Sequence, residues 1–129
     1  ILVKRCRQAE ILADMLKDFP GVFHIEADNE EKNDLLASFR NGLCEFTILI
    51  ATGALLGTGA NIPQLSTLIL AGDLKSEISH SQAVGRILRI LAGKAEPRVI
   101  DLHDPNPIFS RQFKLRESLY KSKNWQIEY

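Results

Sequence analysis

The sequence predicts an α/β domain in which five or six mostly parallel strands form a sheet with helices on both faces. Five short apolar runs rich in β-branched residues lie at 1–3, 22–25, 46–51, 66–71 and 98–102, and segments of helical or loop character separate them. This alternation is typical of a parallel sheet. The runs are apolar throughout rather than at every second residue, which is expected when helices cover both faces.

The first two helices are predicted from apolar spacing and from end signals. Residues 8–19 carry apolar side chains at helical spacing, and Pro20 follows directly as a stop. The second helix is predicted to begin near Asp28, which can form a capping box with Glu31, and to end at Gly42.

The third helix is predicted to be capped by Ser76 or Ser79 and to run through Leu91, where the turn 92–94 closes it. A last helix is predicted over about 108–120, after a break at 104–107. Residues 125–129 could add an edge strand, while Trp125 itself is expected to pack in the core.

The composition indicates one globular domain with no membrane span. Of the 129 residues, 45% are hydrophobic, and no apolar run approaches the ~20 residues that a membrane helix needs. The 16 basic residues balance the 16 acidic ones, so net charge alone does not indicate nucleic acid. Cys6 and Cys44 lack the spacing of a zinc site, so we expect both to be reduced and buried in a cytoplasmic protein. The apolar start at Ile1 is typical of a core strand, so we expect a fragment.

A glycine-rich stretch follows the third apolar run. Gly53, Gly57 and Gly59 come just after a predicted strand end, which is where open α/β sheets bind their ligands. Glycine lets the backbone approach a phosphate closely and present its N–H groups. A turn without a ligand explains the same glycines, and for this stretch alone it is the favoured interpretation.

Arg86 and Arg89 lie three residues apart in a segment with helical character. Residues at this spacing share one helical face, so both guanidinium groups could bind one polyanion, such as a nucleoside triphosphate. Gly85 favours this interpretation, because an interior helix glycine costs about 1 kcal/mol relative to alanine and usually reflects close backbone approach. The alternative is an amphipathic helix with solvated arginines and these side chains facing inward: Val84, Ile87, Leu88 and Leu91.

The three histidines have simpler interpretations. We expect His24 to be a core or edge residue and His80 to lie on a helix surface. His103, which follows a strand end between Asp101 and Asp104, is more consistent with a turn than with a metal site.

Taken in order, these segments resemble the second RecA-like domain of superfamily 2 helicases over almost the whole chain. Residues 1–5 look like motif IV, residues 50–63 like motif V and residues 82–89 like motif VI. The ending, with 99–104 followed by Arg116 and Tyr120, looks most like the DNA helicases of bacteria and their phages. The resemblance implies a RecA-like three-layer domain over 1–129, with the first RecA-like domain and its Walker motifs absent from this chain.

The resemblance assigns catalytic roles in motif VI. Arg89 matches the arginine finger that reaches the γ-phosphate held by the other domain, and Arg86 matches its partner on the same phosphates. Gln82 would orient the attacking water or bind a phosphate oxygen. Ala83 stands where an arginine is frequent, which leaves two basic groups in this motif.

Binding roles are implied for motifs IV and V. Three residues match positions that contact the nucleotide: Gly57, Gly59 and Asn61. Three others match positions that grip the sugar-phosphate backbone without reading sequence: Lys4, Arg5 and Thr52. Asn61 replaces a frequent aspartate and so keeps an oxygen acceptor without the charge.

The function implied is that of the C-terminal motor domain of an ATP-dependent DNA helicase or translocase in the cytoplasm of a bacterial or phage-infected cell. ATP and Mg²⁺ would be bound mainly by the missing first domain. The partners would be that domain and DNA, although RNA is not excluded. The chain alone is expected to be inactive, because it has no Gly-x-x-x-x-Gly-Lys-Ser/Thr loop. The alternatives are a RecA-like clamp module without catalysis, an RNA helicase domain and an independent mononucleotide-binding protein.

Overall fold

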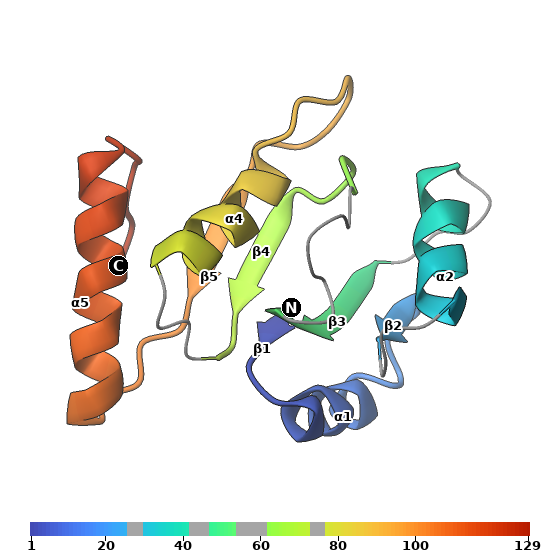
Figure 1. The fold of residues 1–129 in the computed structure, drawn as a ribbon, viewed down its shortest axis with the longest axis horizontal. Coiled ribbons are helices and arrows are strands. Elements are labelled where there is room, and N and C mark those ends of the chain that lie inside the picture. Colours follow the sequence, from blue (N-terminus) through green and yellow to red (C-terminus); the bar gives the residue numbers. More distant parts are fainter. Residues whose placement is uncertain (26–29, 42–46, 54–61, 73–76) are drawn as a thin grey trace.

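The computed structural model describes residues 1–25, 30–41, 47–53, 62–72 and 77–129, in which five parallel strands form one sheet (Figure 1). The strand order is β2-β3-β1-β4-β5. The strands are β1 (Leu2–Val3), β2 (Val22–His24), β3 (Ile48–Thr52), β4 (Thr67–Leu70) and β5 (Arg98–Asp101). Each lies within, or one residue beyond, a predicted apolar run. The α/β prediction is therefore confirmed, and every paired strand that the structure describes is parallel.

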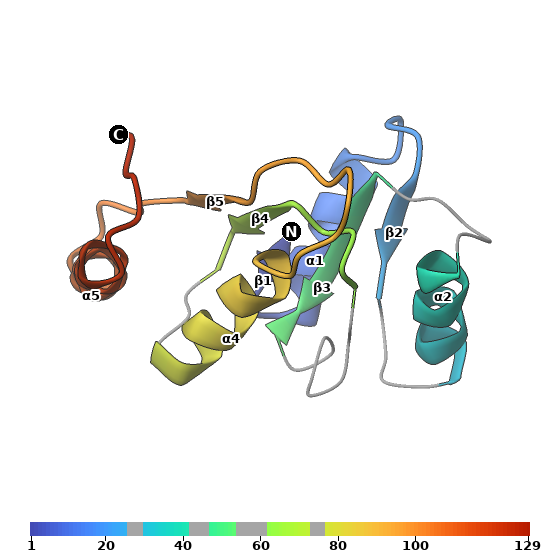
Figure 2. The ribbon, with the colours of Figure 1, turned by 90° about the horizontal axis from the view of Figure 1, so that it is seen from above.

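Helices cover both faces of this sheet (Figure 2). The helices are α1 (Cys6–Met15), α2 (Glu30–Arg40), α4 (Glu77–Ile87) and α5 (Pro107–Ser122). On one face, Val84 and Ile87 of α4 pack on β1 and β4, and Leu36 of α2 packs on β3. On the other face, Ala9 of α1 packs with Val3 and Ile50. Alternate residues of β1 and β3 thus face opposite layers, which explains why their sequences are apolar throughout.

Helix α1 ends four residues earlier than the sequence predicts. Its inward side packs on β1 and β3 through the fully buried Ala9 and, less deeply, through Leu12 and Leu16. Beyond Leu16 the packing stops: Met15 is already 70% exposed, and Phe19 is 58% exposed. The spacing persists along the chain beyond the point where the sheet offers a surface to cover, so the prediction of a longer helix was wrong.

Helix α4 also ends early, at Ile87 rather than Leu91. Val84 and Ile87 are each 1% exposed, as an inward-facing stripe requires, but Leu88 and Leu91 are 47% and 42% exposed. Ser79 lies within the helix and is therefore not its cap, and Ser76 lies outside the described residues, as do Asp28 and Gly42. Residues 125–129 form no strand, whereas Trp125 packs against the α4 cluster as expected.

Gly72 marks a close contact between the ends of β4 and β1. A Cβ atom at this position would lie 2.7 Å from the backbone nitrogen of Lys4. The chain leaves β1 through α1 on one face and leaves β4 towards α4 on the other (Figure 2). The carboxyl ends of β1 and β4 therefore form the topological switch point of the sheet, which is where open α/β folds bind their ligands.

Within the described ranges, no helix has the length and apolar character needed to span a membrane. Cys6 is an exposed free thiol in the first turn of α1, so the expectation that it is buried was wrong. Cys44 lies outside the described residues.

Candidate nucleotide and nucleic-acid interface

Helix α4 carries two of the three residues predicted to be catalytic, Gln82 and Arg86. Val84 and Ile87 face the sheet, while Gln82 is exposed and Arg86 is half-buried. Arg89 lies two residues beyond the helix and is exposed, so the prediction that both arginines share a continuous helical face was wrong. Burial and then the nearby charge of Arg89 lower the pKa of Arg86. The charges of the two arginines thus interact even though the helix ends between them.

The segment after α4 is held by Lys94. Its Nζ atom donates one hydrogen bond to the carbonyl oxygen of Ile87 at 2.6 Å and another to that of Arg89 at 2.8 Å. Gly93 has a φ of +77°, which turns the chain back so that the ammonium group reaches the helix end. A cation there satisfies carbonyl groups that would otherwise lack donors and also interacts favourably with the helix dipole. The turn at 92–94 was predicted from the sequence, but the hydrogen bonds of Lys94 to the helix end were not.

Gly85 lies on the exposed side of α4. A Cβ atom placed there would meet nothing within 4 Å among the residues that the structure describes. The close backbone approach expected from the sequence is therefore not made within this part of the chain.

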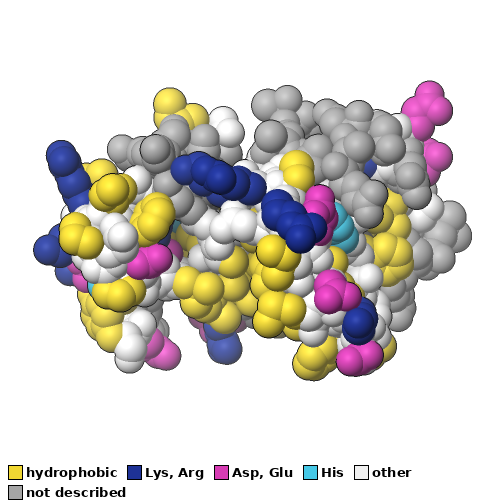
Figure 3. All heavy atoms as spheres, turned by 90° about the horizontal axis from the view of Figure 1, so that it is seen from below, with side chains coloured by type: hydrophobic (Ala, Val, Ile, Leu, Met, Phe, Trp, Pro, Cys, Tyr) yellow, Lys and Arg dark blue, Asp and Glu magenta, His cyan; other side chains and the backbone are white. Residues whose placement is uncertain are grey.

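Lys4 and Arg5 connect β1 to α1 at the edge where the strands end. The side-chain oxygen of Gln8 accepts hydrogen bonds from the backbone N–H groups of Lys4 at 3.3 Å and Arg5 at 3.1 Å. The turn is thereby fixed while both basic side chains remain exposed. Figure 3 looks onto this edge, and dark blue Lys and Arg side chains lie near its middle.

Thr52 lies beside Lys4, because the register pairs it with Val3. Thr52 is only 5% exposed, so it offers little surface to a ligand. The motif V residues Gly57, Gly59 and Asn61 lie outside the described residues, and their expected roles stay predictions.

A cavity of about 690 Å³ opens between the first turn of α1 and the N-terminal half of α5. One wall carries Lys4, Arg5 and Arg7, and the base is formed by the end of β4 at Gly72. The opposite wall includes His103 and Gln112. Sequence reasoning did not find this second wall, because no local pattern places residues 102–112 beside residues 4–8. The His103 ring stacks on Phe113 at 4.5 Å, and its Nε2 lies 3.1 Å from Ser110 Oγ, as its expected turn position allows.

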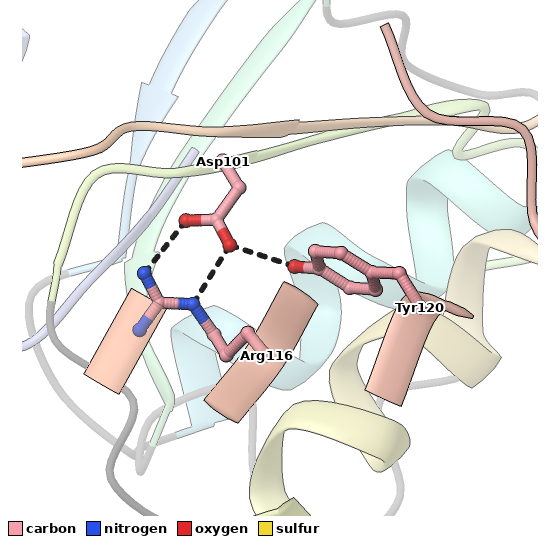
Figure 4. A network of polar contacts seen from close by, with 3 residues as sticks. All are labelled: Asp101, Arg116 and Tyr120. Atoms are coloured by element: carbon pink, nitrogen blue, oxygen red, sulfur yellow. Dashed lines mark hydrogen bonds and ion pairs between the residues drawn. The ribbon is translucent and has the colours of Figure 1, made fainter. Parts of the chain in front are cut away.

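A buried network fixes α5 against β5 (Figure 4). The carboxylate of Asp101 accepts hydrogen bonds from Arg116 Nε at 2.7 Å, from Arg116 Nη2 at 2.8 Å and from Tyr120 Oη at 2.7 Å. The side chains of Arg116 and Asp101 are 9% and 7% exposed. Burial alone would lower the pKa of Arg116, but the hydrogen bonds and charge of Asp101 raise it overall. Burial and then the hydrogen bond to Asp101 raise the pKa of Tyr120.

His80 lies next to this network rather than on a helix surface. It is 1% exposed, and its ring lies 5.2 Å from that of Tyr120, so the surface prediction was wrong. Burial, partly offset by the charge of Asp101, lowers the pKa of His80. The ring of Tyr120 in α5 packs against His80, and this contact between residues distant in sequence could not be inferred from helical spacing. No group of three or more potential metal ligands occurs within the described ranges.

The parallel sheet, the helices on both faces and the arginine-bearing α4 define a RecA-like α/β domain of the kind that forms the second half of superfamily 2 helicases. The chain belongs to the helicase conserved C-terminal domain family, which matches residues 1–91. It is 33% identical to the putative helicase 161L of Invertebrate iridescent virus 6 over 98% of this chain and 31% of that protein. It is 28% identical to the ATP-dependent DNA helicase uvsW of Enterobacteria phage T4, over 81% of this chain and 21% of that protein.

A solved structure supports the fold independently. The E. coli DEAD-box protein SrmB, crystallised with the regulator of ribonuclease activity A, superimposes with a TM-score of 0.61 at 21% sequence identity. The match covers 78% of this chain and 58% of that one. The chain thus spans about a third and a fifth of the length of the two helicase relatives, and it represents a helicase domain.

Proposed function

We propose that this chain is the C-terminal motor domain of an ATP-dependent DNA helicase or translocase, whose Walker motifs lie on a first RecA-like domain elsewhere in the same protein. ATP and Mg²⁺ would be held mainly by that domain. From this side, Arg86 and Arg89 would neutralise charge on the transferring phosphoryl group, and Gln82 would bind a phosphate oxygen or the attacking water.

The observation that carries this proposal is the position of α4, which is anchored on the sheet by Val84 and Ile87, carries Gln82 and Arg86, and is followed at once by the exposed Arg89. Burial and then the positive charge of Arg89 lower the pKa of Arg86, so an anion close to both groups would be favoured. Gly85, beside Arg86, has open space over its backbone. An interior helix glycine costs about 1 kcal/mol relative to alanine, which is consistent with close approach by a group from outside the described chain.

The nucleic-acid contacts would lie at the edge where the strands end. Lys4 and Arg5 are exposed there on a turn that Gln8 fixes, as a backbone-gripping site requires. Thr52 is buried beside them, so we assign it to contact through its backbone or to the shape of the strand end. The DNA assignment rests on the phage T4 relative, whose name is that of a DNA helicase.

The test is ATP hydrolysis by the longer protein that contains both RecA-like domains. Arg89→Ala should lower nucleic-acid-stimulated turnover by a factor of about 10³ to 10⁵, as for other arginine fingers, while ATP binding changes little. Arg86→Ala should also lower turnover. Arg111→Ala, at an exposed arginine of α5, is the matched control and should leave turnover near that of the parent protein.

Near-normal turnover of Arg89→Ala would contradict the finger assignment. If the parent protein binds ATP but its ATP hydrolysis is not stimulated by DNA or RNA, the non-catalytic clamp module would be favoured. Stimulation by RNA alone would replace DNA with RNA as the substrate.

A further inference from the structure

We propose that the cavity at the switch point between β1 and β4 binds a backbone phosphate of the nucleic-acid strand between two walls, and that the second wall is formed by His103 and Gln112. This inference rests on the proposed function, since it extends the contact assigned to Lys4 and Arg5. It adds residues that lie beyond the part of the chain matched by the helicase family, residues 1–91.

The position of the cavity is the first reason. It lies at the carboxyl ends of β1, β4 and β5, where the connections leave the sheet on opposite faces. The contact of Gly72 with the backbone of Lys4 brings the ends of β4 and β1 together at its base. Crevices of this kind bind ligands in open α/β sheets because the strand ends hold the surrounding loops on a rigid frame.

The charge of the lining is the second reason. Lys4, Arg5 and Arg7 contribute to one wall, where Arg7 also pairs with Glu10 at 2.9 Å, and Asp104 is the sole carboxylate among the described lining residues. Asp104 is engaged locally, since its Oδ1 accepts a hydrogen bond from the backbone of Asn106 at 2.8 Å. The first turns of α1 and α5 both border the cavity, so the positive ends of two helix dipoles add to the basic side chains. The cavity therefore suits an anion.

Gln112 places a polar side chain with an unsatisfied atom beside the cavity. Its side-chain oxygen is buried and has no hydrogen-bond partner among the described residues, although the residue lines the cavity. An unsatisfied buried polar atom costs about 1–3 kcal/mol. A phosphate offers acceptor oxygens, so the amide of Gln112 would bind it after a half-turn, with an N–H group as donor.

The second wall is rigid enough to act as a binding surface. Asp101 binds Arg116 through two hydrogen bonds and Tyr120 through one, which locks α5 to the end of β5. His103 is positioned by the same helix, through Phe113 and Ser110. A phosphate in the cavity would thus meet side chains that are already ordered, which lowers the entropic cost of binding.

The experiment is a titration of the isotope-labelled 129-residue chain with an oligothymidylate of about ten nucleotides, followed residue by residue by NMR. Backbone amide signals of Arg5 and Arg7 and those of His103 and Gln112 should shift together. Gln112→Glu places a negative charge in the cavity with little change in size and should weaken binding about fivefold to tenfold at low salt. Arg111→Gln changes the net charge equally on the adjacent, exposed residue outside the cavity and should change affinity less than about twofold.

The outcomes separate this inference from the proposed function. Shifts confined to the α1 wall, or unchanged affinity of Gln112→Glu, would overturn the two-walled site and leave the Lys4 and Arg5 contact standing. An absence of shifts on both walls would overturn both. Since the titration of the unaltered chain reports on each wall directly, the test does not depend on the folding of either variant.

Discussion

The Asp101→Asn variant should lose a large part of the stability of the domain. The substitution removes the negative charge and leaves the guanidinium of Arg116 buried at 8% exposure without its counter-ion. Removing one partner of a buried ion pair costs about 3–5 kcal/mol, because the remaining charge is not compensated. Domains of this size are stable by about 5–15 kcal/mol, so the variant should be marginal.

The geometry sets the order of effects within the network. Tyr120→Phe removes one hydrogen bond to a carboxylate and leaves the ion pair intact, for which a loss of about 1.5–3 kcal/mol is expected. Asp101→Leu combined with Arg116→Met removes both charges at once. Replacing a whole buried pair by apolar side chains is often close to neutral, so this double variant should be more stable than Asp101→Asn alone.

The assay is unfolding in urea followed by far-ultraviolet circular dichroism, with free energies compared at constant slope. Glu10→Gln is the control, because it breaks the exposed ion pair with Arg7, whose side chains are 79% and 49% exposed. That variant should change stability by less than about 1 kcal/mol. If Asp101→Asn costs no more than Glu10→Gln, or if the double variant is the least stable of the set, the network does not hold α5 as described.

Two other predictions concern pH and packing. Because the pKa of Tyr120 is raised in the folded state, the unfolded chain loses its proton first as the pH rises past about 10. Above that pH, this group should lower the free energy of unfolding by about 1.4 kcal/mol per pH unit. In urea unfolding, Tyr120→Phe should therefore lose stability less steeply with pH than the parent chain. Equal slopes for the two proteins would contradict the assignment. Gly72→Ala should destabilise the chain by about 1–3 kcal/mol, because the new methyl group would lie 2.7 Å from the backbone nitrogen of Lys4. Thermal unfolding measures this loss. An unchanged melting temperature would show that the ends of β1 and β4 can move apart.

The sheet could be predicted from the sequence because each strand carries its own signal. The runs around Ile50 and Leu70 are apolar on both faces, and this pattern is local. Helix ends were less predictable where the apolar spacing outlasts the packing surface, as at Phe19 and Leu91. At α4, the helix ends where Lys94 returns to bind carbonyl groups, and hydrogen bonds between a side chain and a distant backbone leave no periodic trace.

The candidate site divides in the same way. Lys4, Arg5, Gln82, Arg86 and Arg89 could be selected because they lie in short motifs. The wall of His103 and Gln112 could not, because it depends on the order of β1, β4 and β5 in the sheet. The burial of His80 likewise depends on Tyr120, which is 40 residues away in the sequence.

The two motif VI arginines are positioned by different parts of the chain. Arg86 takes its place from a helix anchored on the sheet, whereas the backbone at Arg89 is tethered by an ammonium group five residues further on. The spacing between the two cationic groups can consequently be altered without replacing either of them. A change at Lys94 would alter it, which makes this lysine a remote determinant of how the pair would fit the proposed nucleotide.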